Sequence, residues 1–216
     1  MKLANGQVLL SATDLSNHLS CTHLTQLNRK HAHKELVRPE RKNRFLDRIV
    51  ERGLKHEEAY IDHLKSDASL NVVEFEYKEA NVVEKTLKAM NEGVGIIAQG
   101  ALRNDCWGGR PDLLIKTSTP STAFGGWSYE VADTKLTKTT KAGTILQLCV
   151  YSEMLAEIQN QAPEKMFVVM PDDVEVSPFQ IETHRFDDYA AYFRIAKKNL
   201  VQDANRVIDT LSLIHI

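Results

Sequence analysis

The residue types best suited to chemistry lie in the middle of the chain. Asp112 begins a short apolar run, and Asp133 and Lys135 belong to a predicted strand that spans residues 129–135. Successive side chains of a strand point to opposite faces, so Asp133 and Lys135 are expected on the same face. If Asp112 stands at the end of a neighbouring strand, two carboxylates and one ammonium group meet at a single point.

Such a group is the minimum needed for metal-assisted cleavage of a phosphodiester bond. Acidic oxygens hold a divalent cation, Mg²⁺ or Mn²⁺, which activates a water molecule and neutralises charge on the phosphate. The lysine either orients or deprotonates that water, or pairs with the phosphate as a point charge. The alternative is a surface salt bridge among the same side chains, which contributes little to stability.

Pro111-Asp112, followed by Asp133-Thr134-Lys135, resembles the signature of the PD-(D/E)XK nucleases. A further match at Gly53-Leu54-Lys55-His56, and two more downstream, make the chain similar to the RecB-like branch of that superfamily. This branch includes the RecB and AddB nuclease domains and the CRISPR-associated exonucleases. The similarity extends from Ser11 to about Pro171. Its ordered positions are His56, Asp112, Asp133, Lys135, Gln147 and Tyr151.

The resemblance implies a restriction-endonuclease-like α/β core, with a central mixed β-sheet flanked by helices and a helical region before it. It also implies a metal-dependent DNA nuclease of repair, recombination or defence that uses Mg²⁺ or Mn²⁺. The residues implied to bind the metal are His56, Asp112, Asp133 and, through its backbone carbonyl, Thr134. The residues implied in catalysis are Asp112, Asp133, Lys135, Gln147 and Tyr151.

Some of these positions also have simpler interpretations. His56 lies on a predicted helix, where a single histidine is more often a packing or surface residue. Gln147 and Tyr151 are four residues apart on a predicted helix, so both can reach one groove, and in the family this pair lies beside the active site. The same spacing fits the border of an ordinary core stripe.

Length and element pattern predict a single domain. Residues 1–68 are expected to form a mainly helical N-terminal region, and residues 69–185 the α/β catalytic core. Residues 186–216 are expected to form a C-terminal helix without a C-cap signal, so the chain is predicted to continue beyond Ile216. Because relatives of this kind often precede a helicase region, a helicase in the same chain is an expected partner.

Hydrophobic periodicity and turn residues predict the individual elements. Ser11 to Asp14 resembles a capping box, after which leucines continue as one helical stripe to Leu27. The other helices are expected from Asn43, at 81–90, at 142–159 and from Asp187. Strands are expected at 71–78, 93–102, 110–115, 129–135, 165–170 and 179–184, with an acidic turn at 171–175.

The net charge of −2 does not indicate a nucleic-acid partner, but the charges are unevenly distributed. Residues 29–56 hold ten Lys and Arg against four Asp and Glu, and such a segment can focus a polyanion onto one face. The alternative is an ordinary solvated helix surface. The side chains predicted to contact DNA are Arg41, Lys42, Arg44, Lys138 and Lys141.

Cysteine usage and hydropathy exclude several classes. The three cysteines, Cys21, Cys106 and Cys149, lack CxxC spacing, so neither a zinc knuckle nor a disulfide framework is indicated. Because no cysteine follows Cys149, no iron–sulfur cluster of four thiolates is expected from this chain. No apolar run approaches the roughly 20 residues that span a bilayer, and no secretory signal begins the chain. A cytoplasmic protein without a membrane partner is predicted.

Two other functions remain beside the nuclease. One is a non-catalytic module that binds or guides nucleic acid within a larger helicase–nuclease machine. The other is an interaction or regulatory domain of a repair or defence assembly. The combination of two acids and one lysine favours catalysis over both, and a titration of divalent metal with a DNA substrate separates the nuclease from the others.

Overall fold

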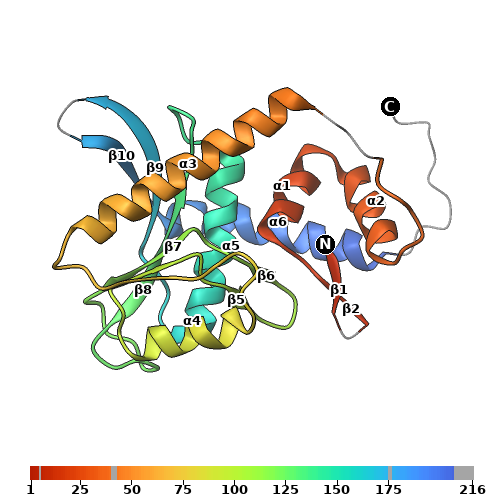
Figure 1. Ribbon diagram of the computed structural model, residues 1–216. Coiled ribbons are helices and arrows are strands. Elements are labelled where there is room, and N and C mark those ends of the chain that lie inside the picture. Colours follow the sequence, from red (N-terminus) through yellow and green to blue (C-terminus); the bar gives the residue numbers. More distant parts are fainter. Residues whose placement is uncertain (5, 40–42, 175–176, 207–216) are drawn as a thin grey trace.

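A six-stranded mixed β-sheet forms the centre of the computed structural model, which describes residues 1–4, 6–39, 43–174 and 177–206 (Figure 1). The strand order is β10-β9-β8-β7-β4-β3, and the β3–β4 and β8–β9 pairs are parallel whereas the others are antiparallel. The strands are β3 (Val72–Glu74), β4 (Ile96–Ala98), β7 (Leu113–Thr117), β8 (Ser128–Thr134), β9 (Lys165–Val174) and β10 (Ser177–Arg185). The predicted α/β class with a central mixed sheet is confirmed.

Strand β8 is buried along its whole length because helices cover both faces of the sheet. Val131 belongs to the larger core cluster on one face, together with its cross-strand neighbour Leu114. Ala132 belongs to a smaller cluster on the opposite face, together with its neighbour Leu113. This alternation is the period of two that a strand imposes on its side chains.

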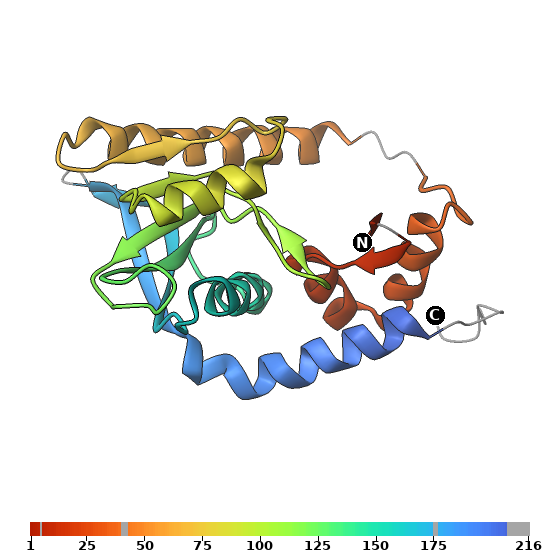
Figure 2. The same ribbon diagram turned by 90° about the horizontal axis from the view of Figure 1, so that it is seen from below.

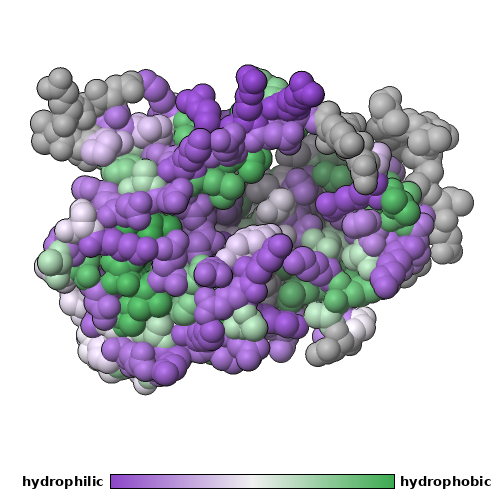
Figure 3. Space-filling view, viewed as in Figure 1, coloured by the Kyte–Doolittle hydropathy of each residue, from purple (hydrophilic) through white to green (hydrophobic). Residues whose placement is uncertain are grey.

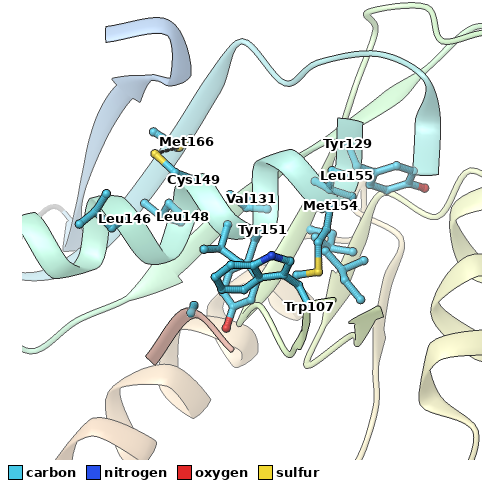
Figure 4. Close-up of a cluster of buried hydrophobic side chains, with 14 of the residues drawn as sticks. Trp107, Tyr129, Val131, Leu146, Leu148, Cys149, Tyr151, Met154, Leu155 and Met166 are labelled. Atoms are coloured by element: carbon cyan, nitrogen blue, oxygen red, sulfur yellow. Dashed lines mark hydrogen bonds between the residues drawn. The ribbon is translucent and has the colours of Figure 1, made fainter. Parts of the chain in front are cut away.

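Helix α5 (Ala142–Gln159) fills the larger cluster, and its bounds agree with the predicted helix. Leu148 and Leu155 are fully buried and pack in the same cluster as Val131 and Met166 (Figure 4). The helix is apolar around most of its circumference because α6 (Phe186–Asn205) covers its outer side. Figure 2 shows the resulting layers in the order α3, sheet, α5 and α6.

Helix α3 (Arg44–Ser66) lies on the other face of the sheet, and only its second half is buried (Figure 1). Tyr60 and Ile61 pack there against Leu113, Ala132 and Val169. The first half is exposed, including the large apolar side chains Phe45, Leu46, Ile49, Val50 and Leu54. The sequence predicts this helix as part of the N-terminal region, and in the structure it forms one of the layers that cover the sheet.

The N-terminal segment packs beside the sheet and is joined to it by α6 (Figure 2). It contains β1 (Lys2–Ala4), β2 (Gln7–Leu9), α1 (Ala12–Ser20) and α2 (Thr22–Ala32). Ser11 and Asp14 form the predicted capping box, with Ser11 at the N-cap. The predicted single helical stripe is wrong, because Cys21 adopts an extended conformation (φ −162°) and divides the segment into two helices.

Other boundaries differ from the predicted ones. The predicted strand 93–102 is interrupted at Gln99, whose φ of +53° is incompatible with a continuing strand. It is divided into β4 and β5 (Leu102–Arg103), and β5 pairs with β6 (Gly108–Gly109). The strand expected at 71–78 is limited to β3, and helix α4 (Val82–Asn91) follows as predicted. The acidic turn predicted at 171–175 is wrong for residues 171–174, because β9 continues through Val174.

Across the described ranges, no helix is long and apolar enough to cross a membrane.

One buried glutamine side chain pairs with the edge of β8 at the positions that β9 does not reach. Pairing of β8 with β9 starts at Val131, so the backbone of Tyr129 lacks a strand partner on that side. Gln159, fully buried at the end of α5, accepts a hydrogen bond from Tyr129 N (2.8 Å) and donates one to Tyr129 O (3.1 Å). The side chain therefore replaces two ladder hydrogen bonds.

Gln159→Ala is expected to lower the free energy of unfolding by about 2–4 kcal/mol, because two buried backbone groups lose their partner. Urea denaturation measures this difference. Gln180→Ala, on the exposed side of β10, is the control and is expected to change stability by less than about 0.5 kcal/mol. Equal effects of the two substitutions would contradict the role given to Gln159.

Candidate functional site

The two predicted aspartates meet at the end of the β7–β8 pair. Leu113 is paired with Ala132, so one further step of the antiparallel register places Asp112 opposite Asp133. Directly opposite residues of antiparallel strands extend from the same face, and the two carboxyl groups are close enough to hydrogen-bond when one is protonated. Asp112 Oδ2 also accepts hydrogen bonds from Thr134 N (2.7 Å) and Thr134 Oγ1 (2.8 Å).

Lys135 joins this pair as the strand periodicity predicts. Its ammonium group forms an ion pair with Asp133 Oδ2, and its side chain remains partly exposed to solvent. Its backbone N donates to the carbonyl of Val169 on β9 (2.8 Å). The lysine is therefore held at both its backbone and its charged end.

Helix α5 contributes Gln147 and Tyr151 from the opposite side of the pair. Gln147 Nε2 donates to Asp133 Oδ1 at 2.9 Å. Tyr151 lies one turn later, is 6% exposed and belongs to the large core cluster, where Figure 4 shows it beside Trp107. A Cβ atom at Gly109 would lie 2.6 Å from Tyr151 Cε1, so only glycine allows this ring position.

Burial and like charge determine the ionisation of Asp133. Asp133 is fully buried, and burial together with the Asp112 carboxylate raises the pKa of Asp133 to about 7. The Lys135 ammonium opposes that rise without cancelling it. A divalent cation would relieve the repulsion between the two carboxylates, because it removes the excess negative charge.

Glu57 is a third carboxylate near this site, and it was not among the predicted site residues. It lies on α3 and accepts a hydrogen bond from the side-chain amide of Gln99. Burial, then Asp112 and Asp133, raise the pKa of Glu57 to about 7. Helical spacing could have predicted the inward position of Glu57. It lies three residues before Tyr60 and four before Ile61, so it shares the face of these two buried residues.

His56, predicted to bind metal, lies beside the Lys135 end of the site. Its Nε2 lies 3.4 Å from the carbonyl oxygen of Val169, which also accepts the Lys135 backbone N, and its ring centroid lies 5.6 Å from that of Phe179. Within the described ranges, no hydrogen bond or ion pair joins His56 to Asp112 or Asp133. The histidine is therefore near the site but not hydrogen-bonded to either carboxylate.

Three of the predicted DNA-contacting side chains lie within the described residues, and all three are exposed. Arg41 and Lys42 lie outside the described residues. Arg44 is the exposed first residue of α3, and Lys141 is exposed at the N-cap of α5. Lys138 is exposed in the link between β8 and α5.

The capacity for metal rests on Asp112 and Asp133. In the part of the chain that the structure describes, no three or more His, Cys, Asp or Glu side chains gather closely enough to surround one ion. Mg²⁺ commonly binds through only one or two carboxylates and keeps several water ligands, so this pair suits it. Asp133 Oδ2 is buried and has no hydrogen-bond donor, with the Lys135 ammonium as its ion-pair partner.

The comparisons with known proteins give no family assignment. The chain matches no protein-family model, and a search of curated proteins finds no match.

The raised pKa of Asp133 makes stability depend on pH. Between the ordinary carboxyl pKa and about 7, the folded state binds more protons than the unfolded state, so stability falls as pH rises through that interval. Asp133→Asn removes this proton linkage. In EDTA at pH 8 the variant is expected to be more stable than the unchanged protein, by on the order of 2 kcal/mol.

Urea denaturation at pH 5.5 and pH 8 tests this expectation, and the difference is expected to shrink at the lower pH. If Asp133→Asn is instead less stable than the unchanged protein at pH 8, the folded protein stabilises the ionised carboxylate of Asp133, and the expectation is wrong.

Proposed function

We propose that this protein is a metal-dependent nuclease that hydrolyses phosphodiester bonds of DNA, with a restriction-endonuclease-like core of the RecB-like kind. The observation that carries the proposal is the connected set Asp112, Asp133, Lys135 and Gln147. Asp112 immediately precedes β7, Asp133 lies on β8, Lys135 immediately follows β8, and Gln147 lies on α5. The four side chains converge on the buried Asp133 carboxylate. An isolated surface salt bridge would have neither this burial nor the second carboxylate.

Each residue has a defined task in the proposed reaction. Asp112 and Asp133 hold Mg²⁺ or Mn²⁺, which when bound lowers the pKa of a water ligand and neutralises charge on the phosphate. Lys135 positions the attacking water and interacts with the phosphate charge. The water oxygen forms a bond to phosphorus, one phosphorus–oxygen bond of the backbone breaks, and the departing oxygen takes up a proton.

The supporting side chains act by holding the carboxylates in place. Gln147 fixes one oxygen of Asp133, which leaves the other facing Lys135. Thr134 fixes one oxygen of Asp112 through two donors. Such preorganisation supplies much of an enzyme's rate acceleration, because no reorientation is needed as charge develops. Tyr151 borders the site and is placed to contact the substrate.

A non-catalytic module that guides nucleic acid is the second candidate. The observation that favours it is that His56 is not hydrogen-bonded to Asp112 or Asp133, and that no three potential metal ligands gather among the described residues. Metal-dependent cleavage separates the two candidates.

Asp133→Ala is expected to abolish Mg²⁺- or Mn²⁺-dependent cleavage of DNA while leaving the fold intact, because the buried metal ligand is removed. Gel assays of a labelled DNA strand measure cleavage, and circular dichroism checks the fold. Glu92→Ala, an exposed carboxylate after α4, is the matched control and is expected to cleave normally. Full cleavage by the Asp133 variant would refute the assignment.

Lys135 and Lys141 are expected to differ in what they contribute. Lys135→Ala should lower the single-turnover rate at saturating enzyme at least about a hundredfold with little change in DNA affinity, because this ammonium is fixed beside Asp133. Lys141→Ala should weaken binding and preserve the rate at saturation, because its side chain is exposed. Similar saturated rates for both variants would make Lys135 a simple phosphate contact.

A further inference from the structure

Two grooves of opposite charge border the Asp112–Asp133 pair. The acidic groove is lined by Glu57, Glu58, Glu74, Glu76, Tyr77 and Gln99 among others, and its lining includes no basic side chain among the described residues. The basic groove is lined by Lys2, Tyr77, Arg103, Gly109, Arg110 and Tyr151 among others, with no acidic side chain in the same described ranges. Their volumes, 560 and 500 Å³, are similar, so charge rather than room distinguishes them.

Neither aspartate lines a groove, but each groove has one lining residue next to the pair. The acidic groove reaches it through Gln99, whose backbone N donates to the carbonyl of Asp112 at 2.8 Å. The basic groove reaches it through Tyr151, one helical turn after the glutamine that holds Asp133. Figure 3 shows that this face of the molecule is hollowed below α3.

We propose that the basic groove binds the sugar–phosphate backbone of the nucleic-acid strand that enters the site, and that the acidic groove excludes it. The nature of the ligand rests on the proposed nuclease function, whereas its course rests on the charges of the grooves. Phosphate groups one after another along a strand are attracted to a basic wall and repelled by a row of carboxylates.

The cations available for phosphate are Lys2 and Arg103. Both side chains are exposed, and within the described ranges neither forms an ion pair with an acidic residue. Arg110 is already engaged, because its guanidinium donates to the backbone carbonyls of Tyr77 (2.8 Å), Glu76 (3.2 Å) and Gln99 (2.5 Å). Arg110 therefore shapes the groove, and the other two side chains contact the strand.

Tyr77 stands where the grooves meet and offers a surface for a base. Its side chain is 80% exposed, and the Arg110 guanidinium lies 5.8 Å from its ring centroid. The hydrogen bond from Arg110 to the carbonyl of Tyr77 fixes the backbone beneath the ring. An exposed, anchored aromatic ring beside a basic groove is the arrangement that stacks an unpaired base.

The proposed groove does not include the basic segment 29–56, which the sequence offers either as a DNA path or as an ordinary solvated helix surface. The described basic residues of that segment lie on α2, in the link after it and on α3, whereas Lys2 lies on β1 and Arg103 on β5.

Binding of a labelled oligothymidine strand, followed by fluorescence anisotropy in EDTA over a salt series, tests the groove. Lys2→Ala with Arg103→Ala is expected to reduce the slope of log affinity against log salt by about 1.4, which is roughly 25-fold weaker binding at 0.1 M salt. The control removes one lysine and one arginine from the exposed side of α6, as Arg194→Ala with Lys198→Ala, and is expected to leave the slope unchanged.

Tyr77→Ala is expected to weaken binding about tenfold without changing the salt slope, and Tyr77→Phe to bind normally, because stacking needs the ring and not the hydroxyl. Glu58→Gln with Glu76→Gln is expected to bind as tightly as the unchanged protein or more tightly. Weaker binding by this acidic-groove variant would overturn the proposed course of the strand.

The outcomes for the groove and for the nuclease are distinct. A protein that binds through Lys2 and Arg103 but cuts no DNA with Mg²⁺ or Mn²⁺ retains the groove and loses the proposed activity. A protein that cuts DNA, with equal salt slopes for the groove and α6 variants, retains the activity and loses the groove. Absence of any binding by the unchanged protein overturns the groove.

Discussion

The burial of Asp133 beside a second carboxylate, that of Asp112, is the constraint on which the site depends. Burial and the like charge of Asp112 disfavour the ionised form of Asp133, so the pair needs compensating groups. Lys135 supplies charge, Gln147 supplies an amide donor from α5, and Thr134 supplies two donors from the neighbouring strand position. These polar contacts fix α5 relative to the sheet in a way that apolar packing alone would not, since a shift of either element would leave a buried carboxylate without its partner.

Part of this arrangement could be predicted because it is local. Alternation along residues 129–135 predicted that Asp133 and Lys135 share a face, and their ion pair confirms it. The strong apolar pattern of α5 predicted both of its ends and placed Gln147 on it. The opposition of Asp112 and Asp133 depends instead on the β7–β8 register, which the connecting loop determines and which the sequence predicts only as two carboxylates at strand ends.

The rest depended on packing between distant segments. The strand is interrupted because Gln99 adopts a left-handed backbone conformation. A glycine or asparagine at this position would have predicted that conformation, whereas a glutamine does not. The position of Glu57 at the site follows from which residues of α3 are buried. The sequence also did not predict the separation of charge between the two grooves. The cations of the basic groove come from β1 and β5, and most of the anions of the acidic groove come from α3 and β3, so residues far apart in the sequence form each groove. Net charge counted over consecutive residues does not reveal a groove whose charged residues are distant in the sequence.

The hydrogen bonds of Arg110 affect how two segments of the protein unfold locally. One guanidinium is hydrogen-bonded to carbonyls from two segments, the chain after β3 and the residue that follows β4. Neither segment can leave its native position without depriving the same half-buried cation of acceptors, so local fluctuations of the two are coupled. Amide hydrogens of the two segments should accordingly exchange with solvent as one cooperative unit, with a common opening free energy.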